Sequence, residues 1–493
     1  MESIGLLMGF EKILNLQNLG FAFIGALLGT LVGVLPGLGP ASAIALLFPL
    51  LGHLPPVGAI IMLAGIYQGS QYGGSTTSIL VNVPGEMSSI VTCFDGYAMT
   101  KQGRPGPALA ISAIGSFIAA TIAMIALTFS APLLANAAII FGPPEYFGLY
   151  LLSLTSIIGF SGGSIFKGLL TALFGLFLTL VGVDPMSGVI RLTFKIPILS
   201  GGLDIVPVFI GLFGITEALS QLEETIDGTV KKIGRLMPTW EELKRGIFAS
   251  LRGGLLGTAL GVLPGMSPSI GSFLSYDLEK RISKHPEKFG TGMIEGIAGP
   301  EAANNGTSIS GMIPMMSLGI PTCATLALVL AALVVYGVQP GPLMFTQHAE
   351  MAWSVIASLY IGNLMLLILN LPLVGLWARL SLVPSHIMAG AVIVLCTIAS
   401  WVNRFSMFDC WLMFIFGLIG YYMRKKNWPP APLVLGFIIG PMTEQSLRQT
   451  ISMYGGNLLG PFSRPLFVCL FIGALVSLFF GFHMQRRATV MKD

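Results

Sequence analysis

A short apolar stretch interrupted by proline and glycine occurs twice in this chain and limits the possible folds more than any other feature. Residues 28–40 read LGTLVGVLPGLGP and residues 256–268 read LGTALGVLPGMSP; nine of the thirteen positions are identical, at a separation of 228 residues (256 − 28). Proline removes a backbone donor and clashes with the preceding helical turn, whereas glycine tolerates conformations that other residues avoid. The repeat predicts a duplicated fold whose halves each contain one interrupted apolar segment.

The sequence around the two motifs is too apolar for a soluble domain. Hydrophobic residues make up 54% of the 493 residues and charged residues only 10%, whereas soluble domains carry roughly 25% charged residues. This composition predicts a polytopic membrane protein, and the net charge of +4, spread over short loops, indicates topology rather than a nucleic-acid surface. Interrupted helices at matching positions of two halves are typical of a transporter's binding site.

The duplication predicts five segments along the chain. They are an interfacial amphipathic helix (1–19), a transmembrane repeat (20–220), a charged cytoplasmic connector with a second interfacial helix (221–252), a second transmembrane repeat (253–462), and an extra transmembrane helix with a cytoplasmic tail (463–493).

Loop charge predicts that the two repeats have opposite orientations in the membrane. The loop with Lys101 and Arg104 corresponds to the uncharged residues 337–342, and the uncharged residues 50–56 correspond to the basic loop 280–288. Lysine and arginine accumulate on the cytoplasmic side, so equivalent loops lie on opposite faces. We therefore expect an all-α fold of two inverted-topology repeats with broken helices and re-entrant helical hairpins, a cytoplasmic C-terminus and an external N-terminus.

Four patches rich in glycine, hydroxyl and amide residues interrupt the apolar pattern, at 36–42, 73–78, 264–269 and 304–310. Freed N–H groups at half-helix N-termini suit carboxylates, and no lysine or arginine lies in the patches. The alternative is that these small residues only permit close helix packing. The candidate solute ligands are Ser42, Ser75, Thr76, Thr77, Asn82, Ser269, Asn304, Asn305, Thr307 and Ser308.

Freed carbonyls and hydroxyls in the same patches also suit a hard cation such as Na⁺. The cation-coupling candidates are Gly37, Gly39, Gly265, Ser267 and Glu301, and the expected hairpin tips are Pro36, Gly37, Pro40, Pro264, Gly265 and Pro268. Glu301 is the acid inside a patch, and an acid within the membrane is costly and usually functional. Glu86 lies just past another patch, so two interpretations stay open: coupling, or contact with interfacial water.

The sequence argues against an enzyme and against a resident cofactor. The five cysteines lie singly without C-x-x-C spacing, and no histidine stands at ligand spacing from a cysteine or carboxylate, so a transition-metal site is not expected. The string at 306–311 lacks the G-x-S-x-G spacing of a serine hydrolase. We expect no cofactor, with Na⁺ or H⁺ as the coupling ion.

Four linked motifs resemble the large membrane subunit of bacterial tripartite tricarboxylate transporters (TctA type). They are GVLPGLGP (33–40), YGGSTTSILVNVPGE (72–86), GPEAANN (299–305) and LGIPT (318–322), and the resemblance covers nearly the whole chain. Gly306 departs from the family's commoner alanine. The resemblance implies an inner-membrane secondary transporter that works with a small membrane subunit and a periplasmic solute-binding protein. It also implies uptake of citrate-like or dicarboxylate substrates coupled to sodium or protons, and elevator-like movement would fit the inverted repeats.

Three alternatives remain at this stage. A passive channel would be excluded by gradient-driven accumulation. A membrane-embedded enzyme acting on lipid is disfavoured by the lack of a paired acid and base. A carboxylate carrier that needs no binding protein would be separated by uptake measured with and without that partner.

Overall fold

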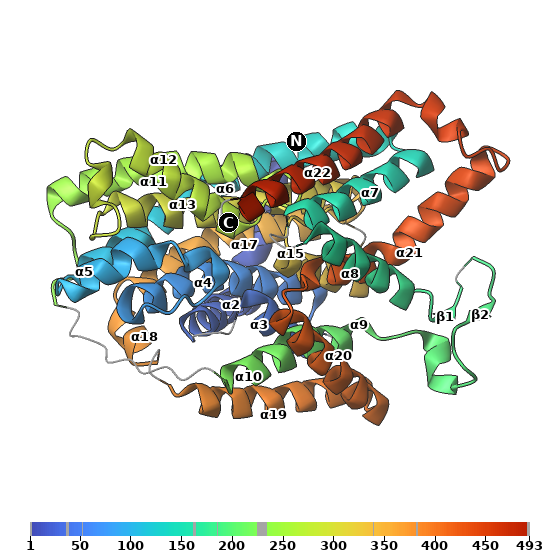
Figure 1. Cartoon of the computed structure of the whole chain (residues 1–493), viewed down its shortest axis with the longest axis horizontal. Helices are drawn as coiled ribbons and strands as arrows, with labels where there is room; N and C mark the ends of the chain where they lie inside the picture. The colour runs from blue at the N-terminus through green and yellow to red at the C-terminus, as the bar shows by residue number, and fades with distance from the viewer. Residues whose placement is uncertain are drawn as a thin grey trace.

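The protein is an all-α membrane protein with one small β-hairpin (Figure 1). A computed structural model describes residues 2–35, 39–51, 53–160, 164–184, 186–223, 234–338, 340–380 and 383–490. Within these ranges, four helical stretches are long and apolar enough to cross a membrane: Leu16–Val34, Pro105–Ile140, Ala349–Asn370 and His386–Arg404.

The first half contains ten α-helices and the hairpin among its described residues. The α-helices are α1 (Glu2–Ile13), α2 (Leu16–Val34), α3 (Pro40–Leu51), α4 (Pro56–Val81), α5 (Ala98–Lys101), α6 (Pro105–Ala137), α7 (Pro143–Phe160), α8 (Ile165–Leu178), α9 (Ile205–Phe209) and α10 (Thr216–Gln221). Shorter turns are η1 (Met87–Ser89), η2 (Cys93–Tyr97), η3 (Ala138–Ile140), η4 (Pro197–Gly201) and η5 (Ile210–Ile215). Strands β1 (Gly182–Val183) and β2 (Ile190–Arg191) pair antiparallel, Gly182 opposite Arg191.

The second half follows a similar order. Its α-helices are α11 (Trp240–Gly261), α12 (Pro268–Ile282), α13 (Glu295–Ser310), α14 (Met312–Leu318), α15 (Ala324–Val335), α16 (Met344–Gln347), α17 (Ala349–Asn370), α18 (Val374–Leu380), α19 (Ser385–Arg404), α20 (Met407–Lys425), α21 (Pro430–Met453) and α22 (Pro465–Val490). Its short turns are η6 (Pro286–Lys288) and η7 (Gly460–Ser463). The predicted boundary at 252/253 falls inside α11, which runs unbroken from the connector into the second repeat.

Glycines four residues apart bring two pairs of helices into close contact, α2 along α4 and α11 along α13. A Cβ atom added to any of them would lie 2.2–2.5 Å from a backbone carbonyl oxygen of the facing helix. The pairs are Gly25–Met62, Gly29–Ile66 and Gly33–Ser70 in the first half, and Gly253–Gly299, Gly257–Ala303 and Gly261–Thr307 in the second. A larger residue would separate the helices, so glycine sets their spacing.

These contacts repeat with a constant register. The second set of glycines follows the first by 228 residues (253 − 25), which is also the separation of the two sequence motifs, and the facing carbonyls follow by 237 (299 − 62). The same separation relates the ends of the two inner helical segments (319 − 82): α4 ends at Asn82 with φ 60° and α14 at Gly319 with φ 74°.

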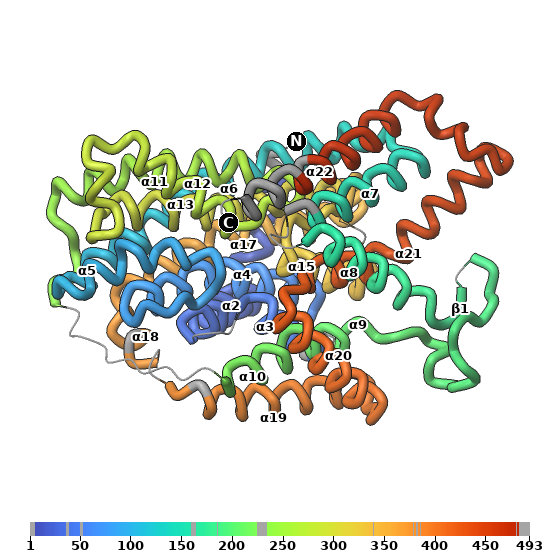
Figure 2. Tube along the Cα trace, viewed as in Figure 1, coloured from blue at the N-terminus to red at the C-terminus, as the bar shows by residue number. Residues whose placement is uncertain are grey.

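Long helices exchange partners between the two halves. α17 of the second half packs on α2 and α4, whereas α6 of the first half packs on α11 and α13. Likewise α8 packs on α21, and α20 packs on η5. In Figure 2 the cyan α6 accordingly lies beside the green α11 and α13 rather than within its own half. The halves are therefore interwoven and do not form two separate bodies.

Two of the four predicted helix interruptions are wrong. Residues 73–78 lie inside the continuous helix α4, and residues 304–310 lie inside α13. Hydroxyls in these patches bond carbonyls of their own helix, Ser78 with Gly74 at 3.1 Å and Ser308 with Asn304 at 2.8 Å. The small residues therefore support close packing without breaking the helix. Residues 262–267 do interrupt the chain between α11 and α12, with Gly265 at φ 81°.

The first two segments and the last helix are anchored by side-chain contacts. α1 packs on α17, and Lys12 forms an ion pair with Glu350 at 2.9 Å. α22 packs on α7. The main apolar core lies between these layers; within it Phe209 of α9 contacts Phe48 of α3 and Phe437 of α21 edge to face. The interfacial position of residues 1–19 stays a prediction.

Candidate functional site

Glu301 lies at the contact between the inner helices of the two halves. It projects from α13 and is fully buried. The Ser75 hydroxyl of α4 donates a hydrogen bond to one carboxylate oxygen at 2.5 Å, and the Thr92 hydroxyl donates to the other. The structure thus joins two predicted site residues, Ser75 and Glu301, that are 226 positions apart in the sequence.

The partners of Glu301 differ from those of every other fully buried acid in the described ranges. Four of these acids pair with arginine: Glu145 with Arg464, Asp184 with Arg448, Glu279 with Arg252 and Asp409 with Arg404. Asp95 accepts four hydrogen bonds, from the Tyr276 hydroxyl and the amides of Gly290, Gly292 and Met293. Within the same ranges Glu301 has no cationic partner. An ionised carboxylate in such a place needs a proton or a cation.

Glu86 and Asn304 extend the cluster around Glu301. Glu86 interacts electrostatically with Glu301, accepts a hydrogen bond from the Ser88 hydroxyl, and accepts another from Asn304 Nδ2 at 3.4 Å. Asn304 is fully buried, and its Oδ1 has no partner in the described part of the chain. An unpartnered amide oxygen beside two carboxylates is an oxygen-donor set of the kind that binds hard cations. We call Ser75, Glu86, Thr92, Glu301 and Asn304 the Glu301 cluster.

The other predicted ligands on α4 and α13 are buried next to this cluster. Asn305 Nδ2 donates to Ser116 Oγ of α6 at 2.7 Å and to the Glu301 carbonyl at 3.1 Å. Thr307 is buried with an Oγ1 that lacks a partner in the described ranges. Thr76 and Thr77 are buried, and Thr77 bonds the Gly74 carbonyl at 3.3 Å.

Three predicted ligands lie apart from the Glu301 cluster. Ser42 of α3 bonds the Phe213 carbonyl at 3.3 Å and lines a separate cavity with Thr216 and Arg424. Asn82 is exposed at the end of α4 and lines a cavity near Lys101. Ser269 is half-buried in the first turn of α12.

The predicted cation and hairpin residues other than Glu301 lie in the interruptions. Gly39 and Ser267 are half-buried directly before α3 and α12, and Gly265 is buried. Pro40 and Pro268 are buried first residues of those helices, and Pro264 is half-buried in the turn before α12. Pro36 and Gly37 lie outside the described residues. No described residue of this group contacts the Glu301 carboxyl by a hydrogen bond.

Sequence analysis missed Thr92 and left Glu86 undecided. Both follow α4 in the irregular segment 82–92, which folds back on α4 so that the Gly85 amide bonds the Gly74 carbonyl at 3.3 Å. A Cβ on Gly85 would lie 2.1 Å from the Gly33 carbonyl oxygen. The two glycines of V-P-G-E and Y-G-G-S were the available signal, because close backbone approach requires them.

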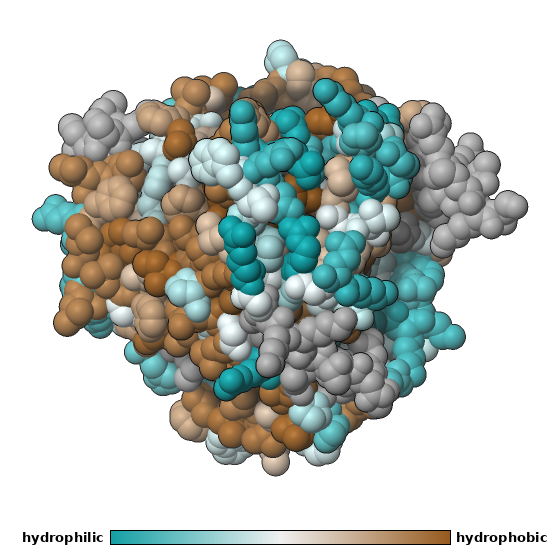
Figure 3. All heavy atoms as spheres, turned by 90° about the vertical axis from the view of Figure 1, so that its left-hand side faces the viewer, coloured by the Kyte–Doolittle hydropathy of each residue, from teal (hydrophilic) through white to brown (hydrophobic). Residues whose placement is uncertain are grey.

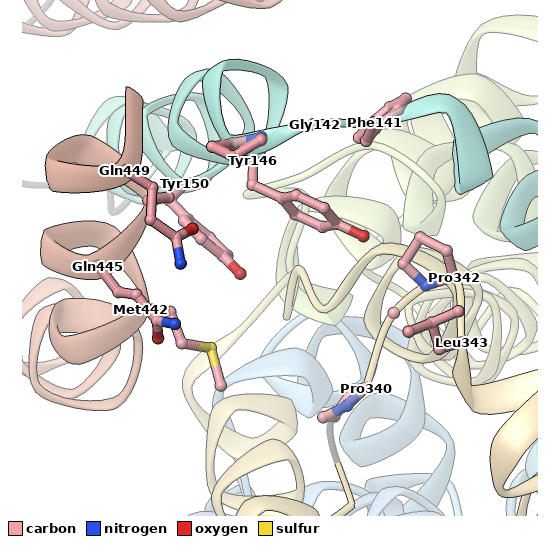
Figure 4. A pocket seen from close by; sticks show the side chains of 13 residues that line it. Phe141, Gly142, Tyr146, Tyr150, Pro340, Pro342, Leu343, Met442, Gln445 and Gln449 are labelled. Atoms are coloured by element: carbon pink, nitrogen blue, oxygen red, sulfur yellow. The ribbon is translucent and has the colours of Figure 1, made fainter. Parts of the chain in front are cut away.

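Cavities lie outside the buried cluster rather than inside it. One, of about 770 Å³, is lined by Asn82, Cys93, Lys101 and Lys280 among others. Another, of about 310 Å³, lies between α7, α21 and residues 340–343; Tyr146, Tyr150 and Gln445 point into it (Figure 4). The end of the molecule that carries α5 shows hydrophilic side chains gathered beside a hydrophobic area (Figure 3).

The Glu301 cluster can hold a proton or a small hard cation. It offers two carboxylates, an amide oxygen and hydroxyls, and in the described ranges no three His, Cys, Asp or Glu side chains gather as a transition-metal site would require. This chemistry suits exchange of an ion with water better than permanent retention of one.

Comparison with known proteins gives the family. The tripartite tricarboxylate transporter TctA family matches residues 19–435. A protein of Agrobacterium vitis, described as an uncharacterized 52.8 kDa protein in the TAR-I ttuC' 3' region, is 43% identical over 462 residues, or 93% of this chain and 92% of that protein. A second protein of that organism, from the TAR-II ttuC' 3' region, is 38% identical over 230 residues, or 45% of this chain and 95% of that protein. No solved structure matches the chain.

The family match covers the helices that build the Glu301 cluster and both glycine-packed pairs. The family is one of transporters made of several components, which agrees with the predicted membrane transport class and with partner subunits in general. The chain belongs to the tripartite tricarboxylate transporter TctA family.

Proposed function

We propose that this chain is the large transmembrane subunit of a secondary transporter that imports carboxylates. In this proposal a periplasmic binding protein delivers the solute, a small membrane subunit assembles with the chain, and a sodium or proton gradient drives uptake in the bacterial inner membrane. The family supplies the transport class. The observation that carries the coupling is Glu301, a fully buried carboxyl with hydroxyl partners where the other buried acids have arginine or four donors.

The Glu301 cluster is the coupling site in this proposal. Binding of Na⁺ or H⁺ would neutralise Glu301 and Glu86, which removes the electrostatic cost of burying them. Because Ser75 comes from α4 and Glu301 from α13, occupancy of the cluster changes the attraction between the inner helices of both halves. An ion bound there therefore favours one arrangement of the two halves over another.

The predicted inverted repeats give a mechanism for alternating access. The register-matched glycine contacts and the exchange of α6 and α17 between halves support an internal duplication. Opposite orientations are supported by loop charge, since the Lys101 loop and the Lys280 loop are basic while their counterparts are not. Elevator-like movement of the body built on α4 and α13 relative to the surrounding helices is the motion that this arrangement favours.

Uptake into proteoliposomes tests the proposal. The chain and the small subunit are reconstituted, and binding protein preloaded with radiolabelled di- or tricarboxylate is supplied with or without an inward Na⁺ or H⁺ gradient. Uphill accumulation that Glu301→Gln abolishes supports the function and the site. Ser220→Ala is the matched control, because this buried hydroxyl bonds only the Thr216 carbonyl of its own helix, at 2.9 Å.

Three other results would contradict the proposal. Downhill flux that ignores both gradients would indicate a channel. Equal uptake without the binding protein would indicate an independent carrier. Full gradient-driven uptake by Glu301→Gln would remove the cluster from the coupling mechanism.

A further inference from the structure

The cavity near Lys101 has walls from both halves of the chain. One wall is η2 and α5, with Cys93 and Lys101; the other is α12 and the turn after it, with Lys280 and Gly290. Its volume is about 770 Å³. This space exceeds that of a single small ion, so an organic solute can enter it.

The charge of this cavity is positive and unopposed. Lys101 and Lys280 are both exposed, and neither has an ion pair in the described part of the chain. The two acids that flank Lys280 on α12 are already paired, Asp277 with Arg281 at 2.7 Å and Glu279 with Arg252 at 2.6 Å. The Lys101 ammonium lies 4.8 Å from the centre of the Tyr97 ring, which lines the same cavity.

The acid in the cavity wall does not cancel this charge. Asp95 is fully buried and spends both carboxylate oxygens on the opposite wall, where the Gly292 amide donates at 2.8 Å and the Tyr276 hydroxyl at 2.9 Å. Gln102 Nε2 also bonds the Thr291 carbonyl at 2.6 Å. These bonds tie the two walls together, so the lysines are held on a shared frame.

The cavity is one residue away from the Glu301 cluster. Cys93 lines the cavity, and its neighbour Thr92 donates a hydrogen bond to Glu301. The Asn82 side chain, at the end of the helix that carries Ser75, also lines it. A solute in the cavity would thus contact the segment 82–93 that closes over the buried carboxyls.

We propose that the Lys101 cavity is a carboxylate-binding vestibule, in which Lys101 and Lys280 attract the anion and the Asn82 amide binds it next to the Glu301 cluster. This inference rests on the proposed function for the identity of the anion. Positive charge at a concave mouth raises the local concentration of an anionic solute. Because both lysines lie in loops with a cytoplasmic charge bias, the vestibule serves solute release.

Charge-selective labelling of Cys93 tests the vestibule. The full chain in detergent keeps Cys93 as its single cysteine, the other four being replaced by serine or alanine, and reacts with an anionic or a cationic methanethiosulfonate reagent of similar size. We expect the anionic reagent to react faster, and we expect Lys101→Gln with Lys280→Gln to reduce the anion-to-cation rate ratio about fivefold. Millimolar tricarboxylate should slow the labelling, whereas glycerol should not.

The matched control keeps Cys469 instead, which is exposed on α22. Its rate ratio should not change in the double lysine variant. A Cys93 ratio that the lysine variant leaves unchanged would overturn the vestibule, and so would carboxylate that fails to protect Cys93 in a chain that transports it. Conversely, a lysine-dependent ratio with protection by carboxylate supports the vestibule even if uptake shows no gradient coupling, a result that counts against the proposed function alone.

Discussion

The two glycine-packed helix pairs share one backbone arrangement but differ in chemistry. α2 with α4 and α11 with α13 make the same three contacts in the same register. At the position that follows Gln68 by 237 residues (305 − 68), α13 carries Asn305, which bonds Ser116, whereas both amide atoms of Gln68 lack partners in the described ranges. Backbone contacts were thus kept in both halves, while Glu301 and its neighbours occur in one. Packing and coupling can therefore be disturbed separately.

Replacement of a contact glycine should have the largest effect, and it should be similar in the two pairs. Gly29→Val and Gly257→Val place a Cβ 2.5 Å and 2.3 Å from a facing carbonyl oxygen, so each should cost roughly 3 kcal/mol or more. Loss of monodisperse protein in detergent and a lower melting temperature would show this. Gly390→Ala on α19 is the control, because a Cβ there meets nothing within 4 Å. A tolerated Gly257→Val would refute the shared packing.

Glu301→Gln should separate chemistry from packing. The amide can still accept hydrogen bonds from Ser75 and Thr92, so the melting temperature should stay within about 3 °C. Uphill uptake should fall at least roughly tenfold, equivalent to about 1.4 kcal/mol of lost coupling. A variant that unfolds would instead indicate a structural role for the carboxyl, and Ser75→Ala would then show whether the hydrogen bond alone matters.

Exchange of polar side chains at the equivalent positions should give smaller effects of opposite sign. Asn305→Ala leaves the buried Ser116 without its donor and should destabilise by about 1–2 kcal/mol, whereas Gln68→Leu removes two unpartnered buried atoms and should be neutral or stabilising by up to ~1 kcal/mol. Thermal unfolding of the two variants measures both. Destabilisation by Gln68→Leu of the same size would show that the two halves are chemically equivalent here after all.

The smallest effect concerns a region far from both pairs, the β1–β2 hairpin. Hydrogen bonds from Ser187 and Arg448 hold the pKa of Asp184 below its usual value. Its stabilising contribution is therefore complete above the unfolded pKa of about 4 and is lost as the pH falls below that value. Wild type should lose more melting temperature between pH 5 and pH 3 than Asp184→Asn does. Parallel curves for the two proteins would contradict the assignment.

Sequence reasoning placed the duplication correctly but misjudged what the polar patches do. Glycine, serine and threonine at 73–78 suggested a broken helix, yet hydroxyl bonds to the preceding turn keep α4 continuous. The prediction failed because the same residue types serve interruptions and close packing alike, and only the facing helix distinguishes them. Ser75 and Glu301 were both named as site residues, but nothing in their spacing shows that they touch.

Composition and the repeated motif by themselves determined the membrane class, the duplication and the family resemblance, because these depend on residue types and on separation along the chain. Only the tertiary structure decided which buried acid lacks an arginine. Glu145, Asp409 and Glu301 are alike in sequence as isolated acids in apolar surroundings, and they differ in what the fold places beside them. The free energy of a buried charge depends on its partners in space, and those come from helices far away in the sequence.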